Sequence, residues 1–253
     1  MVKMPVLFIG HGSPMNALST GDYHQSLANI AATIPQPDAI VVVSAHYLTN
    51  KTMVTASMQP RTIYDFYGFP QELYALTYSC AGSPQTANLI TSLLPEASGD
   101  LRWGIDHAAW LILRHMYPKA DIPVVAMSID STLEPIEHYQ LAKKISSLRN
   151  QNILVIGSGN LVHNLPLADF SNIDAAPYDW VTAFDEETKQ LLLNHNHEKL
   201  IELASTSPLP VPTQEHYLPL LYVLALQEEN DKLKFIFEDI QNASVSMRSF
   251  ILS

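Results

Sequence analysis

Short apolar runs that lack polar alternation are the feature of this sequence that most constrains its fold. Val41-Val42-Val43 forms the middle of one such run. A strand covered on only one face alternates apolar and polar residues, so these runs are typical of strands buried on both faces. The clearest of them occupy residues 5–10, 39–44, 122–129 and 152–157. They predict a central sheet with helices packed on each side.

Longer segments in which apolar residues recur every three or four positions lie between these runs. They predict helices over residues 83–94, 108–117, 134–150, 178–204 and 213–226. Two late β-like segments, 233–238 and 243–252, predict antiparallel additions to the sheet. The alternation of strands and helices favours an α/β fold with a central, mostly parallel mixed sheet flanked by helices. No linker or repeat divides residues 1–253, which predicts a single domain.

Charge and cysteine content exclude several classes of partner and site. Fourteen Lys and Arg against 25 Asp and Glu give a formal net charge of −11, so neither nucleic acid nor a membrane is an expected partner. One cysteine, Cys80, rules out an internal disulfide and a cysteine-rich zinc site. No run reaches the roughly 18 apolar residues of a membrane span, and the N-terminus shows no secretory cleavage pattern. These features predict a soluble cytoplasmic protein.

Three histidines follow predicted strands. His11 and His46 come after the first two, and His163 follows the run that ends in Gly157-Ser158-Gly159, where the glycines predict a sharp turn. Ligands of open α/β sheets bind at the carboxyl ends of the strands. If the first two strands are parallel neighbours, His11 and His46 lie within reach of one metal ion.

Two more histidines stand where helices are expected to start. His107 follows Asp106, and His216 follows Glu215; Asp106 and Thr213 are the predicted helix caps. Imidazole with carboxylate and no thiolate suits zinc, iron(II) or manganese. Two histidines with a carboxylate are the arrangement of non-haem iron(II) oxygenases, and three histidines with water that of catalytic zinc sites. Residue spacing alone leaves both open.

Five segments, taken together and in this order, resemble the class III extradiol ring-cleavage dioxygenases, in the branch similar to DOPA 4,5-dioxygenase. They are GHGSPMNAL (10–18), VVVSAHY (41–47), DHAAW (106–110), GSGNLVHNL (157–165) and PTQEHYLPLLYVLA (212–225). The resemblance implies a single catalytic domain with one metal at the carboxyl edge of the sheet. It implies His11 and His46 as metal ligands, with His216 favoured as the third ligand and Glu215 as the alternative. It also implies His163 as an acid–base residue and His107 as a pocket residue.

The activity implied by this resemblance is insertion of O2 to open the ring of a catechol such as DOPA, by 4,5-cleavage. One divalent metal per chain is then expected, Fe(2+) for ring cleavage, with Zn(2+) possible as the bound ion. The expected partners are a small aromatic diol and O2, and the expected state is a monomer or small homo-oligomer. Expected substrate-binding residues are Ser13, Asn160, Tyr64 and Phe66, the last two from the aromatic-rich segment 59–76. The alternatives are a zinc-dependent hydrolase or lyase on the same scaffold, and a non-catalytic small-molecule or metal-binding protein.

Overall fold

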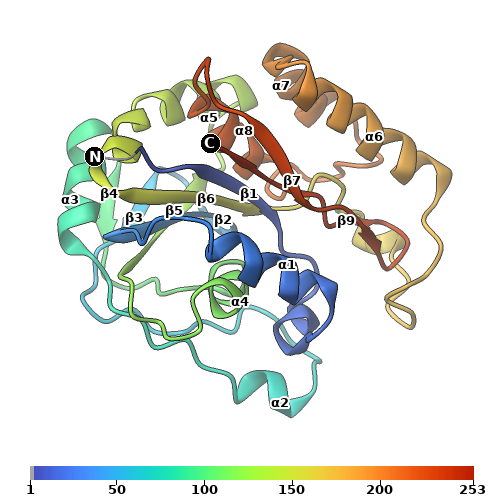
Figure 1. The fold of residues 1–253 in the computed structure, drawn as a ribbon, viewed down its shortest axis with the longest axis horizontal. Helices are drawn as coiled ribbons and strands as arrows, with labels where there is room; N and C mark the ends of the chain where they lie inside the picture. Colours follow the sequence, from blue (N-terminus) through green and yellow to red (C-terminus); the bar gives the residue numbers. More distant parts are fainter. Residues whose placement is uncertain (1–2) are drawn as a thin grey trace.

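An eight-stranded mixed sheet is the centre of the computed structural model, which describes residues 3–253 (Figure 1). Its order is β4-β3-β5-β2-β6-β1-β10-β7. The strands are β1 (Val6–Gly10), β2 (Ala39–Thr49), β3 (Met53–Thr55), β4 (Ser98–Asp100), β5 (Val124–Asp130), β6 (Ile153–Gly159), β7 (Leu233–Phe237) and β10 (Ser249–Leu252). β8 (Ile240–Gln241) and β9 (Val245–Ser246) form a separate two-stranded sheet. The central strands β5, β2, β6 and β1 are parallel, and β10 and β7 are antiparallel additions.

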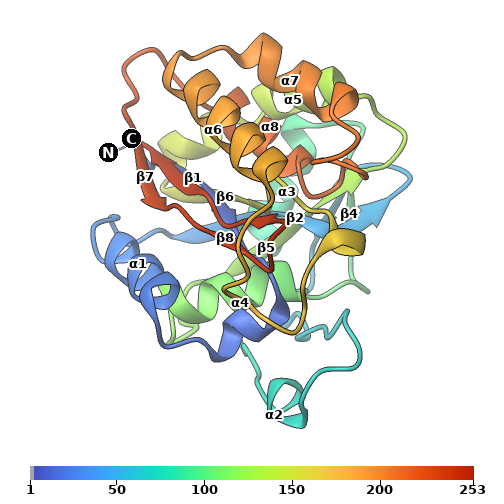
Figure 2. The ribbon, with the colours of Figure 1, turned by 90° about the vertical axis from the view of Figure 1, so that its right-hand side faces the viewer.

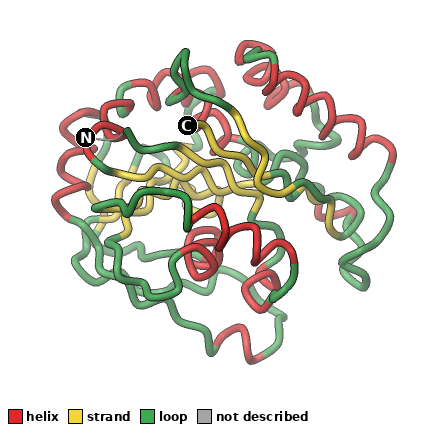
Figure 3. Tube along the Cα trace, in the orientation of Figure 1, coloured by secondary structure: helices red, strands yellow, loops and turns green. Residues whose placement is uncertain are grey.

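Helices cover both faces of this sheet (Figures 2 and 3). α1 (Asp22–Ala31) and α4 (His107–Met116) pack on one face. The other face carries α3 (Pro84–Leu93), α5 (Pro135–Lys143), α6 (Asp179–Leu193), α7 (His197–Thr206) and α8 (Leu218–Ala225). Short helical turns are α2 (Gln71–Tyr74), η1 (Pro14–Leu18), η2 (Ser146–Gln151) and η3 (Leu165–Leu167).

Alternate residues of the apolar runs pack into two hydrophobic cores, one on each face of the sheet. In β2, Val41 and Val43 join the α5 and α8 face, whereas Ile40 and Val42 join the α1 and α4 face. Because successive side chains of a strand point to opposite faces, a strand buried on both faces needs apolar residues at every position. The predicted α/β fold with a mostly parallel mixed sheet is therefore confirmed.

Strand order differs from the expectation in one respect that matters for the site. β1 and β2 are parallel, but they are not neighbours, because β6 lies between them and pairs with both. The expectation rested on chain order, which does not fix strand order when helical crossovers separate the strands. The insertion of β6 brings Ser158 into contact with His11.

Several element boundaries also differ. β2 continues to Thr49 through an irregular register between Val43 and Leu48. The helix expected over residues 178–204 is two helices, separated where His195 adopts a positive φ of 52°. The last helix begins at Leu218 and not near residue 213, because Pro219 fits the first turn of a helix and would break its interior. Ser83 caps α3 as expected, accepting a hydrogen bond from the Thr86 amide.

No helix within residues 3–253 has the length and apolar character needed to cross a membrane.

Candidate metal centre

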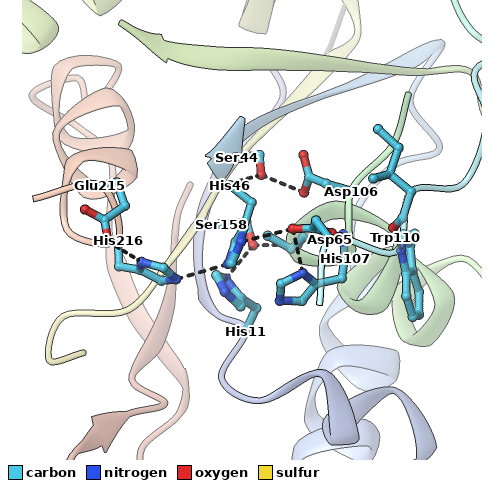
Figure 4. Close-up of polar contacts among 12 residues, drawn as sticks. His11, Ser44, His46, Asp65, Asp106, His107, Trp110, Ser158, Glu215 and His216 are labelled. Carbon is cyan, nitrogen blue, oxygen red and sulfur yellow. Dashed lines mark hydrogen bonds and ion pairs between the residues drawn. The ribbon is translucent and has the colours of Figure 1, made fainter. Parts of the chain in front are cut away.

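Three histidines from distant parts of the chain meet at the carboxyl edge of the parallel strands (Figure 4). His11 directly follows β1, His46 lies in the extension of β2, and His216 lies in the turn before α8. Their candidate ligand nitrogens all lie within 4.8 Å of one another. His11 and His216 are buried and His46 is partly buried. The structure thus brings together the three histidines that the sequence selected.

Glycines allow the segment before α8 to approach β6. A Cβ on Gly159 would lie 2.1 Å from the carbonyl oxygen of His216, so only glycine fits there. The Asn160 amide donates to that same carbonyl at 2.8 Å. The expected sharp turn at Gly157-Ser158-Gly159 is wrong, since all three residues continue β6. The glycines are needed for close approach of another backbone, and they leave the Ser158 side chain facing His11.

Hydrogen bonds at Nδ1 set the tautomer of each of the three rings. The Ser158 hydroxyl donates to the Ala108 carbonyl at 2.6 Å, so its oxygen accepts from Nδ1–H of His11 at 3.1 Å. Nδ1–H of His46 is donated to Asp65 Oδ2 at 3.0 Å. Nδ1–H of His216 is donated to Glu215 Oε1 at 3.1 Å. A neutral imidazole that carries its one proton at Nδ1 presents a lone pair at Nε2.

These lone pairs converge in a way that suits a cation. Nε2 of His46 and Nε2 of His216 are 3.1 Å apart, close enough for both to bind one ion. Burial, followed by the neighbouring histidines, holds the pKa of His11 and of His216 well below the usual value. Neutral imidazole with its second nitrogen hydrogen-bonded is the form that binds metals. The donor set fits a divalent ion that accepts nitrogen ligands.

His163 and His107 flank this cluster. The ring of His163 stacks on that of His216, with centroids 3.5 Å apart. Burial and the neighbouring His216 hold the pKa of His163 well below its usual value. The ring of His107 lies 4.1 Å from that of His46, and its pKa is lowered by burial, against the opposing effect of Asp65. Both are neutral imidazoles beside the candidate metal position.

Two predicted helix caps are wrong. Asp106 stands at the position before α4, but its side chain makes no capping hydrogen bond and accepts instead from Ser44 Oγ at 2.7 Å and Trp103 Nε1 at 3.3 Å. The capping acceptor for the His107 amide is Asp65 Oδ1, at 3.0 Å. Thr213 lies five residues before α8 and donates its hydroxyl to Glu215 Oε1.

The four residues expected to bind substrate have different surroundings. Ser13 caps η1 through the Met15 amide. Asn160 is 1% exposed; its Nδ2 donates to the Ser246 carbonyl and its Oδ1 accepts from the Gly12 amide, where φ is 61°. The Tyr64 hydroxyl donates to the Leu76 carbonyl at 2.5 Å. Phe66 packs edge-on against His107, with ring centroids 5.5 Å apart. Of the four, Phe66 has the side chain that adjoins the histidine cluster.

Comparison with known proteins identifies the family. Residues 5–249 match the family model described as the catalytic LigB subunit of aromatic ring-opening dioxygenase. The chain belongs to the LigB family. Within that family it is an extradiol ring-opening dioxygenase of the kind similar to DOPA 4,5-dioxygenase.

Curated relatives in the LigB family cover nearly the whole chain. A 4,5-DOPA dioxygenase extradiol from Escherichia coli (strain K12) is 42% identical over 98% of this chain and 94% of its own length. The protein of the same description from Beta vulgaris is 35% identical over 96% of this chain and 94% of its own length. The crystal structure of an uncharacterized protein from Escherichia coli K12 superposes with a TM-score of 0.85 at 37% identity, covering 99% of this chain and 100% of the other.

Two residues that contact the candidate metal ligands are not predicted by the sequence. Ser158 orients His11, and Asp65 accepts hydrogen bonds from His46 and His107. The available signal for Ser158 was a polar residue between two glycines at the end of an apolar run. For Asp65 it was an acid enclosed by aromatic residues, Tyr64 and Phe66. Burial opposes ionisation of Asp65, but hydrogen bonds from His107 and His46 hold its pKa below the usual range.

Proposed function

We propose that this protein opens the aromatic ring of a catechol beside its two hydroxyl groups, using one divalent metal held by His11, His46 and His216. The observation that carries the proposal is the convergence of the three rings, whose ligand nitrogens lie within 4.8 Å of one another and each of which has a hydrogen-bond partner at Nδ1. Catalytic sites that bind a metal through three imidazoles leave the remaining positions open to substrate. Membership of the LigB family supplies the reaction class and disfavours the hydrolase, lyase and non-catalytic alternatives.

His216 is the proposed third ligand, in preference to Glu215. Glu215 Oε1 accepts from Nδ1 of His216 and from the hydroxyl of Thr213. These two hydrogen bonds hold the carboxylate on the opposite side of the imidazole from Nε2, which supports a role in orienting His216. Glu215 also lies within 4.8 Å of ligand atoms of His163 and His216, so the two candidates require a direct test.

Iron(II) is the proposed metal. When bound, it supplies the electron transfer between catechol and dioxygen that zinc, which has no redox chemistry, does not. Imidazole ligands bring no negative charge of their own to the ion. This arrangement favours an anionic substrate such as a catecholate.

His163 is the proposed acid–base residue. Because its pKa lies well below the usual value, its imidazole is neutral near pH 7 and has a lone pair to accept a proton from a catechol hydroxyl. His107 is also neutral, and its Nδ1–H is donated to Asp65 at 2.9 Å, which leaves Nε2 as a hydrogen-bond acceptor. We assign to His107 the orientation of substrate or dioxygen.

The substrate is proposed to be a DOPA-like catechol cleaved between carbons 4 and 5. Support comes from the relatives described as 4,5-DOPA dioxygenase extradiol. Phe66 is the proposed wall for the aromatic ring, since it packs beside His107. The hydroxyl of Tyr64 and the side-chain amide of Asn160 donate within the protein, whereas the Ser13 oxygen only accepts from the Met15 amide, so its hydroxyl hydrogen is available to a substrate.

Anaerobic reconstitution tests the proposal. Metal-free protein is loaded with iron(II) or with zinc, mixed with DOPA or 4-methylcatechol, and exposed to oxygen. We expect oxygen uptake and a yellow ring-opened product with iron only, and product NMR assigns the cleaved bond. The variants His11→Ala and His46→Ala are expected to keep the fold, measured by circular dichroism, and to lose stoichiometric metal. Activity with zinc alone, or a metal-loaded protein that is inactive with every catechol, would refute the proposed reaction.

A further inference from the structure

The carboxylate of Asp65 joins two parts of the site that the sequence separates. Its Oδ2 accepts from Nδ1 of His46 at 3.0 Å and from Nδ1 of His107 at 2.9 Å, and its Oδ1 accepts from the His107 backbone amide at 3.0 Å. One side chain thus contacts β2, the start of α4 and the rings of two site histidines (Figure 4). The amide of His107 is at the positive end of the α4 dipole, which favours a carboxylate there.

Hydrogen bonds hold the segment that carries Asp65 against α4 and against the residue Ile105 just before it. Thr62 forms an isolated bridge with Ile105, and the Ile105 amide donates to the Arg61 carbonyl at 2.9 Å. Nε1 of Trp110, in α4, donates to the Ile63 carbonyl at 2.9 Å. The position of Asp65 is therefore determined by hydrogen bonds on the N-terminal side of the residue as well as by its own contacts.

We propose that Asp65 is a positioning residue that holds the protons of His46 and His107 at Nδ1, so that both Nε2 lone pairs face the metal and the substrate. The proposal rests on the proposed function for the metal itself, but the tautomers are a property of the metal-free protein. A carboxylate behind a metal-binding histidine fixes the ring orientation and its tautomer, and its loss commonly weakens metal binding about 10–100-fold.

Three donors share the two oxygens of Asp65, which makes Asp65→Asn a sharp test. The amide keeps one acceptor oxygen and gains a donor. If the NH2 group occupies the place of Oδ2, it faces Nδ1 of both histidines, and the rings move their protons to Nε2, where the metal is expected. If it occupies the place of Oδ1, it opposes the His107 amide, and the start of α4 is disturbed. Either orientation damages the site without changing side-chain size.

Metal affinity and histidine tautomers are the measurements. Cobalt(II) and zinc(II) affinities are measured by competition with a chelator, and imidazole tautomers by nitrogen-15 NMR of metal-free protein. We expect Asp65→Asn to bind metal about 10–100-fold more weakly, with Nε2–H signals appearing for His46 or His107. Asp65→Glu, which keeps two acceptor oxygens, is expected to recover part of the affinity. Glu72→Gln, which removes an exposed acid of α2 in the same segment, is the control and is expected to match the wild type.

The two proposals fail in different ways. Wild-type metal affinity and unchanged tautomers in Asp65→Asn would overturn the role of Asp65, whether or not the protein opens catechols. Conversely, a wild-type protein that binds metal but opens no catechol refutes the proposed reaction, while weaker binding and altered tautomers in Asp65→Asn still support the role of Asp65.

Discussion

Replacing Ser158 with alanine tests the hydrogen bond that orients His11. Ser158 is fully buried, and its hydroxyl joins Nδ1 of His11, at 3.1 Å, to the Ala108 carbonyl, at 2.6 Å. Without that oxygen, Nδ1–H of His11 has no acceptor. In metal-free protein the ring can move its proton to Nε2 and limit the loss. A bound metal prevents this shift of the proton to Nε2, because the metal requires the Nε2 lone pair.

The expected magnitude follows from this difference. Leaving a buried donor unsatisfied costs about 1–3 kcal/mol. Only the metal-bound state incurs this cost in full, and about 1.4 kcal/mol corresponds to a factor of ten in affinity. Ser158→Ala is therefore expected to weaken metal binding about 10–100-fold. The metal-free protein is expected to lose only about 1 kcal/mol of stability, the usual net contribution of one hydrogen bond.

A matched control separates the orientation of His11 from the general loss of a buried hydroxyl. Ser128, in β5, is also fully buried, and its hydroxyl oxygen accepts from Thr49 Oγ1 and from the Met53 amide, neither of which is a site residue. Ser128→Ala is expected to lower stability in urea unfolding while leaving metal affinity unchanged. Chelator competition with zinc or cobalt measures the affinity of both variants. Equal affinities for Ser158→Ala, Ser128→Ala and the wild type would refute the reasoning.

Three further predictions concern other histidines. His216→Ala is expected to lose the metal, whereas Glu215→Gln, which keeps an acceptor for Nδ1, is expected to bind within about 10-fold of the wild type; a metal-bound structure with a Glu215 oxygen about 2.2 Å from the ion and His216 turned away would contradict this. His163→Ala is expected to keep the metal and lose turnover by about 10²–10⁴-fold, and an unchanged rate constant would exclude proton transfer by His163. Burial lowers the pKa of His138 to about 4. Below about pH 6.5, the unfolded chain therefore binds a proton at His138 that the folded state does not bind until the pH approaches 4. Folding stability is therefore expected to fall by roughly 3 kcal/mol as the pH drops from 6.5 to 4, and His138→Gln, followed by urea unfolding across that range, should remove this part of the pH dependence.

Local patterns in the sequence determined the layers of this protein and indicated several of its candidate site residues. Runs in which every residue is apolar specify strands buried on both faces, because successive side chains of a strand point to opposite faces of the sheet. Ser83-Pro84 specifies a helix start, because capping and the fixed φ of proline act over a few residues. The sequence selects His11 and His46 as candidate metal ligands because each follows an apolar run, and carboxyl ends of parallel strands share one edge of a sheet.

Tertiary structure decided how those histidines are held. The insertion of β6 between β1 and β2 places Ser158 behind His11, 147 residues away in sequence. Asp65 reaches His107 across 42 residues and takes the capping role that sequence assigned to Asp106. The Nε2 atoms of His46 and His216, which are 170 residues apart in the sequence, lie 3.1 Å from each other. Strand order and side-chain partners of this kind depend on contacts between distant segments, which a local pattern does not encode. The sequence thus selects the imidazoles, and the packing of β6, Asp65 and Glu215 around them selects their tautomers.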